Sequence, residues 1–244
     1  MREERLNVLS IDWDYFINAS IGERLELFPD GGNENLPDGL GQLIWSGRYI
    51  DGRLNNIKTD TKAIRRLKKC IRNQSLLLET MIVDSHRYAY DFIKDYMFQH
   101  DYDSVNLVNI DFHHDVYDFG TDEVDCGNWL RILMKDLEDS DSKFTWVCRE
   151  DSDDLRLELF DLEKTTSLDI IDEDDWDIIF ICRSGMWSPP HLDKNFMDCF
   201  KWLLEYGGYV RYQESIMKKS RMSGMKELIN SQIKAKEEFM RNAQ

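Results

Sequence analysis

The chain has 244 residues, of which 42% are hydrophobic and 32% are charged, and its formal net charge at pH 7 is -16. The hydrophobic fraction excludes a disordered chain, and the negative charge disfavours nucleic acid and anionic membranes as partners, because phosphate binding needs a basic surface. The same charge favours cationic partners, such as metal ions or an arginine or lysine side chain, or it serves solubility alone.

Along the first half of the chain, apolar runs alternate with segments of helical periodicity. The predicted strands cover 6–11, 81–83 and 105–110, and the predicted helices cover 61–71 and 88–97. The run at 105–110 is short, apolar and rich in β-branched residues, which is typical of an interior strand of a parallel sheet. Residues 28–53 hold two of the four prolines and six glycines, so we expect an irregular loop or an active-site flap there.

The alternation continues in the second half of the chain. The predicted strands cover 144–148, 155–160 and 176–182, and the predicted helices cover 128–137, 193–206 and 212–244. Gly207 and Gly208 stop the helix that precedes the tail. This repeated alternation predicts an α/β protein with a mostly parallel central sheet flanked by helices.

No linker rich in proline, glycine or serine divides the sequence. We therefore predict one domain over 1–244, with a helical C-terminal extension from about residue 212. Apolar residues recur at helical spacing in this extension, at Met222, Met225, Leu228, Ile229 and Ile233. The spacing suits a neighbouring subunit in a homo-oligomer, a partner helix, or packing on the extension's own domain.

The cysteines and the N-terminus both bear on where the protein works. The five cysteines are widely spread and form no C-x-x-C pair, which fits reduced thiols better than a disulfide framework. Residues 1–5 are charged and lack the apolar run of a signal peptide, and no apolar stretch approaches the roughly 18 residues of a membrane span. We expect a soluble, cytoplasmic protein that does not bind membranes.

Two carboxylates and two imidazoles follow the predicted strand 105–110 within five residues: Asp111, His113, His114 and Asp115. In open α/β sheets the active site lies outside the carboxyl ends of the strands. Asp111, His113 and Asp115 alternate, so they can converge on a metal if the extended conformation persists. Mixed carboxylate and imidazole ligation suits Mn²⁺, Fe²⁺ or Zn²⁺, and the lack of nearby thiolates argues against a structural zinc site. A hydrogen-bonded polar turn is the alternative.

Asp12 and Asp14 follow the first predicted strand in the same way. Two carboxylates two residues apart repel each other unless a cation neutralises them, which favours a shared metal centre over an exposed turn. His86 follows the predicted strand 81–83 and brings an imidazole to a third strand end. Together these residues form a ligand set for two metals, which would lower the pKa of a bound water and produce hydroxide near neutral pH.

The loop 183–190 follows the predicted strand 176–182 and should face the same cavity. Arg183 and Ser184 could bind a substrate carboxylate or backbone, and Trp187 could stack on a guanidinium. An ordinary loop anchored by a buried tryptophan is the other interpretation.

The stretch Asp111-Phe112-His113-His114-Asp115 resembles the D-A-H-x-D motif of the arginase, or ureohydrolase, superfamily, and the offset back to His86 is similar to the spacing to that family's first histidine ligand. Asp12-Trp13-Asp14 resembles its S-x-D-x-D motif. With Cys126-Gly127-Asn128-Trp129, these motifs look most like the peptide arginases, which convert arginine residues of ribosomally made precursor peptides to ornithine. The resemblance implies a three-layer arginase-like fold and an arginine-containing peptide as the substrate.

The resemblance also implies a binuclear Mn²⁺ site. The ligands of one ion would be His86, Asp111, Asp115 and Asp12. The ligands of the other would be Asp111, His113, Asp12 and Asp14, with Asp111 and Asp12 as bridges. The hydroxide would attack the guanidinium carbon, and Asp115 would orient it and relay its proton. Asn128, which is similar to the asparagine of the family's S-G-N motif, would hold the substrate.

Two features depart from the arginase pattern. The Asp-x-Asp motif comes late in arginases but first here, so either the strand order is permuted or the match is false. The family's S-G-N-L-H ends in a histidine that shuttles protons, whereas the stretch 127–130 has none. Either His114 takes that role or the site uses another route.

Two other functions remain open. A metal-dependent amide deacetylase of related fold would use one Zn²⁺, and the retention of both Asp12 and Asp14 disfavours it. A non-catalytic binding protein with a vestigial metal pocket would be indicated by the loss of Asp14 or His86, and both are present. We therefore predict a binuclear manganese hydrolase acting on C–N bonds of linear amidines, which cleaves the guanidino group of peptide arginine to give ornithine and urea.

Overall fold

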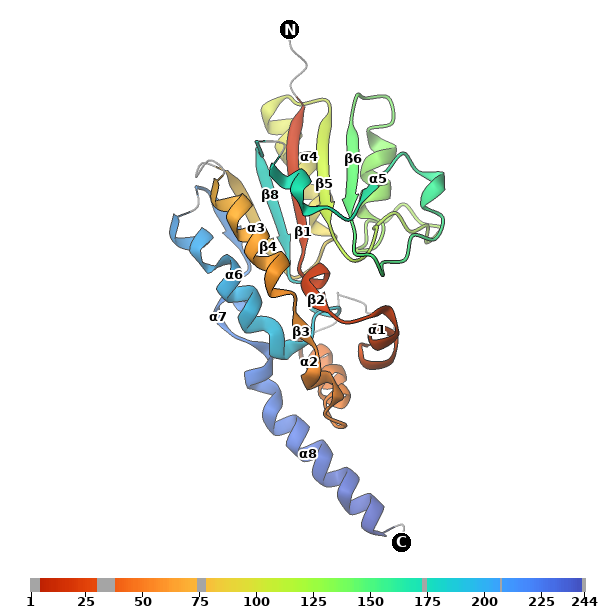
Figure 1. The fold of residues 1–244 in the computed structure, drawn as a ribbon, viewed down its shortest axis with the longest axis vertical. Coiled ribbons are helices and arrows are strands. Elements are labelled where there is room, and N and C mark those ends of the chain that lie inside the picture. Colours follow the sequence, from red (N-terminus) through yellow and green to blue (C-terminus); the bar gives the residue numbers. More distant parts are fainter. Residues whose placement is uncertain (1–4, 30–37, 74–77, 173–174, 207, 243–244) are drawn as a thin grey trace.

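A seven-stranded sheet forms the centre of the computed structural model, which describes residues 5–29, 38–73, 78–172, 175–206 and 208–242 (Figure 1). Its strands are β1 (Leu6–Asp12), β4 (Glu79–Val83), β5 (Val105–Ile110), β6 (Lys143–Val147), β7 (Glu163–Thr165), β8 (Ile178–Cys182) and β9 (Val210–Tyr212). They lie in the order β7-β6-β5-β1-β8-β4-β9, and all neighbours are parallel. The predicted α/β class with a parallel central sheet is confirmed.

Eight α-helices are described around this sheet. They are α1 (Ile21–Leu27), α2 (Asp38–Arg48), α3 (Thr61–Asn73), α4 (Tyr88–His100), α5 (Trp129–Asp136), α6 (Asp193–Tyr206), α7 (Glu214–Lys218) and α8 (Arg221–Asn242). A small antiparallel sheet joins β2 (Ile17–Asn18) to β3 (Lys58–Thr59). Every helix in the described ranges is too short or too polar to span a bilayer.

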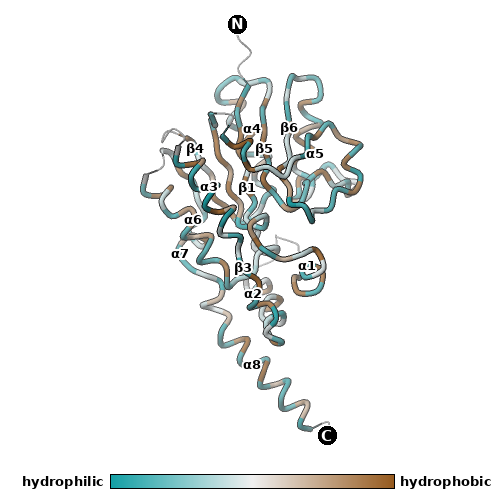
Figure 2. The backbone as a smooth tube through the Cα atoms, in the orientation of Figure 1, coloured by the Kyte–Doolittle hydropathy of each residue, from teal (hydrophilic) through white to brown (hydrophobic). Residues whose placement is uncertain are grey.

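The side chains of the central strands alternate between two hydrophobic cores, one on each face of the sheet. In β1, Leu9 and Ile11 belong to the core that includes residues of α3 and α6, whereas Leu6 and Val8 belong to the core that includes residues of α4 and α5. Figure 2 shows brown segments along the central strands and teal on exposed helix turns. Because helices cover both faces, the interior strands read as nearly continuous apolar runs, which made them recognisable in the sequence.

The prediction of an irregular loop over 28–53 is wrong for residues 38–48, which form α2. This helix contains three glycines, yet Trp45 is buried and its Nε1 donates a hydrogen bond to the Gly185 carbonyl at 3.0 Å. Tertiary packing therefore outweighs the low helix propensity of glycine. The expected flap falls partly on 30–37, which lie outside the described residues.

The predicted strand 155–160 is also wrong, because residues 157–159 form a single turn of 3₁₀-helix. Arg156 adopts a left-handed conformation with φ of 65°, which ends the extended chain, and Leu155 and Leu159 are exposed rather than buried. A strand with no buried face has nothing to hold it in a sheet.

The predicted helical tail is confirmed as two helices, α7 and α8. Met225 and Ile229 of α8 are buried, and α8 packs against α2, so part of the apolar spacing serves the chain's own core. The far end of α8 projects from the body (Figure 1). Assembly with a neighbouring subunit stays a prediction, as does the single-domain organisation.

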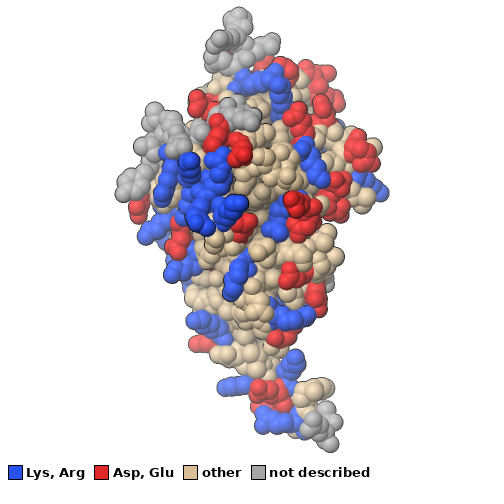
Figure 3. Space-filling view, in the orientation of Figure 1, with Lys and Arg blue, Asp and Glu red and all other residues tan. Residues whose placement is uncertain are grey.

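The surface charge is distributed unevenly. The sequence of α3 contains six basic residues and no acidic one. Figure 3 shows lysine and arginine side chains gathered over this helix and many acidic side chains elsewhere on the same face. The overall negative charge of the chain is thus not uniform over its surface.

Candidate metal centre

The carboxyl ends of β1 and β5 lie side by side and carry the central acidic residues. Ile11 of β1 pairs with Ile110 of β5, so Asp12 and Asp111, the next residues along each strand, leave the sheet beside each other. Both side chains are buried. In parallel sheets this edge is where side chains from different strands can gather into one site.

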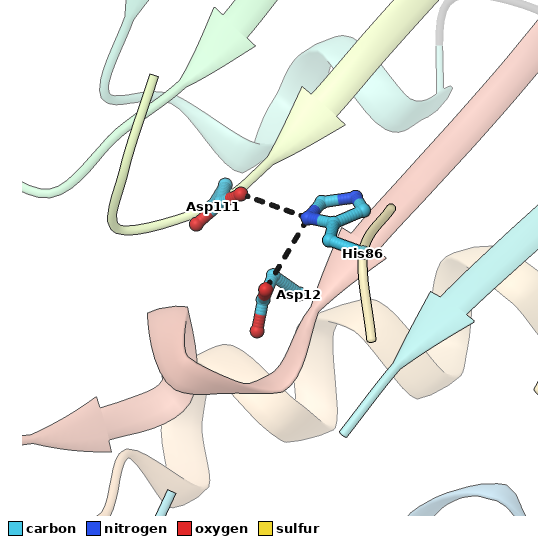
Figure 4. Close-up of side chains that lie close together, drawn as sticks. All are labelled: Asp12, His86 and Asp111. Carbon is cyan, nitrogen blue, oxygen red and sulfur yellow. Dashed lines mark ion pairs between the residues drawn. The ribbon is translucent and has the colours of Figure 1, made fainter. Parts of the chain in front are cut away.

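His86 reaches the same edge from β4, although β8 separates β4 from β1. Its ring stacks on Phe180 of β8, with ring centroids 5.5 Å apart, and lies against Trp129 at 4.8 Å. Its Nε2 is 2.7 Å from the Ser10 Oγ on β1. These contacts fix the ring so that Nδ1 points at the two central carboxylates (Figure 4).

Three carboxylate oxygens approach the Nδ1 of His86. The distances are 3.2 Å to Asp12 Oδ2, 3.1 Å to Asp111 Oδ2 and 3.1 Å to Asp115 Oδ2. Despite this crowding, Nδ1 has no hydrogen-bond partner among the described residues. Ligand atoms about 2.1 Å from an ion and at right angles to each other lie roughly 3 Å apart. The orphaned nitrogen and its neighbours are therefore spaced like ligands of one ion.

A second group of ligand atoms lies beside the first. The potential ligand atoms of Asp12, His86 and Asp111 all lie within 4.8 Å of one another, and so do those of Asp14, Asp111 and His113. His113 Nδ1 is 3.1 Å from Asp14 Oδ2 and 3.9 Å from Asp111 Oδ1. Asp111 thus turns one oxygen toward each imidazole and is shared by the two groups. The buried Oδ2 of Asp14 also lacks a hydrogen-bond partner in the described part of the chain.

Backbone hydrogen bonds hold these carboxylates in place. The amide of Asp14 donates to Asp12 Oδ1 at 3.0 Å, and the amide of His113 donates to Asp111 Oδ1 at 2.8 Å. Each aspartate thus caps the turn that follows its own strand, as aspartate commonly does. Asp12, which the resemblance casts as a second bridge, belongs to the first group alone.

Burial is the largest electrostatic influence on the carboxylates. It raises the pKa of Asp12 to about 7, with repulsion from Asp14 and Asp111 adding to the effect, and it raises the pKa of Asp111 well above its usual range. Burial also opposes ionisation of Asp14, but His113 and Arg24 outweigh it, so the pKa of that carboxyl is lowered. A divalent cation would favour the ionised form of all three.

The two imidazoles respond in the opposite way. Burial alone would lower the pKa of His86, but the surrounding carboxylates raise it well above the ordinary value. The pKa of His113 is raised to about 9 against burial, chiefly by Asp14. A metal ion would replace these protons, and the donor set of carboxylate oxygen and imidazole nitrogen suits Mn²⁺, Fe²⁺ or Zn²⁺. The residues fit a divalent ion, whose identity the donor set leaves open.

Of the two predicted catalytic residues, Asp115 lies beside the first ligand group, whereas His114 lies outside both groups. Asp115 has a left-handed φ of 55°, and its Oδ2 accepts a 2.6 Å hydrogen bond from Trp129 Nε1 beside His86. His114 packs its ring on Tyr117 with centroids 4.1 Å apart, and burial lowers its pKa to about 4. His114 belongs to neither group of ligand atoms. Proton transfer by either residue stays a prediction.

Of the predicted substrate ligands Asn128 and Trp187, only Trp187 lies beside one of the two ligand groups. The Asn128 side chain is buried, with its oxygen accepting from the Asp125 amide at 2.7 Å and its nitrogen donating to the Glu123 carbonyl at 2.9 Å. It therefore holds the loop before α5, and substrate contact stays a prediction. The Trp187 ring lies 5.0 Å from the His113 ring, so it borders the second group.

Arg183 and Ser184 are occupied by contacts within the chain. Arg183 donates two 2.7 Å hydrogen bonds to the carboxylate of Asp84. Ser184 has a left-handed φ of 53°, and its Oγ donates to Asp12 Oδ2 at 2.7 Å. The loop after β8 thus supports the first group, and substrate binding by its two polar residues stays a prediction.

Sequence reasoning missed three supporting residues. Ser10 was visible as a polar residue inside an apolar strand, a signal that it needs a partner. Arg24 lies 3.7 Å from Asp14 Oδ2, donates to the Asp14 carbonyl at 2.8 Å and covers the Phe112 ring at 3.7 Å. Neither Arg24 nor Trp129 carries a sequence signal for these roles, because the contacts arise only in the folded chain.

Comparisons of the chain with protein-family models, with curated proteins and with solved structures found no match. Membership of the arginase superfamily therefore stays a prediction. What the structure does establish is an α/β protein with a parallel sheet and two overlapping groups of buried aspartate and histidine that could hold metal ions.

Proposed function

We propose that the chain is a hydrolase that uses two Mn²⁺ ions to cleave the guanidino group of an arginine residue in a peptide. The observation that carries the proposal is the position of Asp111 between two imidazoles, with one carboxylate oxygen facing each Nδ1. A single shared carboxylate suits two neighbouring ions better than one. The arginase-like motifs that supply these residues support the same function.

Under this proposal His86, Asp12, Asp111 and Asp115 hold one ion, and Asp14, Asp111 and His113 hold the other. Two bound ions supply a water nucleophile that is activated near neutral pH. Water is consumed, the bond from the side-chain nitrogen to the guanidinium carbon breaks, and an ornithine residue and urea are formed. Asp115 Oδ2 lies 3.1 Å from His86 Nδ1, which supports a role for this carboxylate in accepting a proton at the first group.

The edge of the site supports a cationic substrate. His113 is 24% exposed, whereas the side chains of Asp14 and His86 are at most 1% exposed, so a substrate meets His113 first. Trp187 borders His113, and an indole face attracts a guanidinium. The surrounding negative charge of the chain would raise the local concentration of such a cation.

Metal content and peptide mass test the proposal together. The purified chain is loaded with Mn²⁺, its metal is counted, and it is incubated with an arginine-containing peptide that is then weighed by mass spectrometry. We expect about two ions per chain and loss of one CH₂N₂ unit per converted arginine. One Zn²⁺ per chain with release of acetate from an acetyl-lysine peptide would favour a deacetylase instead, and no bound metal would favour a binding protein.

Asp111→Asn supplies the matched variant, because it preserves the side-chain shape and removes the shared negative charge. We expect this variant to bind fewer than two ions per chain and to leave the mass of the peptide unchanged. Full conversion of the peptide by this variant would refute the proposed mechanism.

A further inference from the structure

A cavity of about 640 Å³ opens beside the metal centre, at the carboxyl ends of β4, β8 and β9. Asp84, Arg183 and Gln213, each the first residue after its strand, form part of its wall, and α2, α7, α8 and the loops beside them contribute further residues. No residue of the two ligand groups lines it. The cavity is therefore a separate place on the same edge of the sheet.

Two buried hydrogen-bond donors in this wall lack acceptors. Ser85 is 5% exposed, and its Oγ has no partner among the residues that the structure describes. Arg183 is 4% exposed, and its Nη1 makes no hydrogen bond there, approaching Asp193 Oδ2 only to 3.6 Å. Because a buried donor without an acceptor is costly, an acceptor oxygen placed beside either atom would be stabilising.

Among the charged side chains of the wall, the ammonium group of Lys219 has no carboxylate partner in the described part of the chain. Asp84 is neutralised by its two hydrogen bonds to Arg183, and Glu214 pairs with Lys218 at 2.7 Å. Lys219 also lines the cavity, and within the described ranges no ion pair involves it. In a chain of net charge -16, an uncompensated lysine at a cavity favours an anionic ligand.

The start of α8 adds to this preference. Ser220, Arg221 and Gly224, at its first turn, line the cavity, and the N-terminal end of a helix carries a partial positive charge. The first amides are already bonded, because Arg221 N donates to Asp193 Oδ2. The Asp193 carboxylate thus offsets part of the helix dipole, and the hydrogen bonds to a ligand would come from the unpartnered donors of Ser85 and Arg183.

We infer that this cavity binds a carboxylate group. The carboxylate accepts hydrogen bonds from Ser85 Oγ and Arg183 Nη1 and lies near the ammonium group of Lys219. Its source is either a small free carboxylic acid or the carboxylate of a peptide bound across the neighbouring metal centre. The inference does not depend on the proposed hydrolase activity, because it concerns binding at residues outside the ligand groups.

Calorimetric titration of the Mn²⁺-loaded chain of 244 residues with N-acetylglycine tests the inference, and N-acetylglycine amide is the uncharged control. We expect the acid to bind and the amide not to bind. Lys219→Ala and Ser85→Ala should each weaken binding of the acid about tenfold, the effect of losing one charge-assisted hydrogen bond. Lys143→Ala, which removes an exposed lysine of β6 outside the lining of the cavity, should leave the affinity unchanged.

Equal binding of acid and amide would overturn the inference, and so would wild-type affinity in both Lys219→Ala and Ser85→Ala. Metal content is measured for each variant, because Ser85 precedes His86 and a lost ion would change the heats. Competition between N-acetylglycine and an arginine peptide with a free C-terminus, but not its amidated form, identifies the peptide carboxylate as the ligand. If N-acetylglycine and the peptide bind independently, the ligand of the cavity is a small free carboxylic acid.

Discussion

The hydroxyl group of Ser10 offers a sharp test of how the first ligand group is held. Its Oγ lies 2.7 Å from His86 Nε2 in a buried environment, and Nδ1 of the same ring faces the carboxylates. If Nδ1 binds a metal, Nε2 must carry the proton and donate it to Ser10, which fixes both the tautomer and the ring orientation. Ser10→Ala removes that acceptor without changing any metal ligand.

We expect the affinity for one ion to fall about 10- to 100-fold, as is typical when a metal ligand loses a supporting hydrogen bond. This corresponds to a loss of about 1.4 to 2.7 kcal/mol in binding free energy. Competition with a fluorescent chelator measures the affinity of each ion in turn. The other ion should be less affected, because His113 has no contact with Ser10 among the described hydrogen bonds. Ser46→Ala is the matched control, since this buried serine bonds within α2 to the Leu43 carbonyl. Unchanged affinity for both ions in Ser10→Ala would refute the reasoning.

Three further outcomes are expected. Arg24→Gln should tighten binding of one ion by roughly tenfold, because the guanidinium 3.7 Å from Asp14 Oδ2 repels a nearby cation, and weaker binding in the same chelator assay would contradict this. The metal-free chain should lose thermal stability as pH rises, because the folded-state pKa is raised from 3.8 to about 7 for Asp12 and from 6.5 to about 9 for His113. The stabilisation from each group is complete at a pH below its pKa in the unfolded chain and is lost as the pH rises through its pKa in the folded chain. A melting temperature that increases from pH 4 to pH 9 in the presence of chelator would contradict this prediction. Adding Mn²⁺ at pH 8 should raise the melting temperature, and scanning calorimetry that showed no shift would indicate that the site binds no Mn²⁺.

The strand-end rule predicted which residues gather. Asp12 ends β1 and Asp14 follows it, and Asp111 and His113 follow β5. Both strands were recognisable because burial on two faces leaves an uninterrupted apolar run. His86 was predicted as a ligand on the same rule, although its strand is not a neighbour of β1. The rule needs only that strands be parallel, which is why it worked without knowledge of their order.

The strand order itself was not predictable, and neither were the contacts that depend on it. Ser10 meets His86 across 76 residues of chain, and Arg24 of α1 covers the ring of Phe112, which follows β5. The helix α2 was missed for a related reason, since its glycines suggest a loop and the packing of Trp45 overrides them. Local sequence carries no record of such long-range partners.

The central place of β1 has a consequence for how the protein is made. This strand leaves the ribosome before its partners β5 and β8, which begin only at Val105 and Ile178. An apolar segment that waits this long for its neighbours can meet chaperones or aggregate, and such non-local pairing slows folding. Asp12 can meet Asp111 once β5 is made, but His86 reaches them only after β8 has been inserted between β1 and β4, so the first ligand group should become complete only after residue 182 has been made.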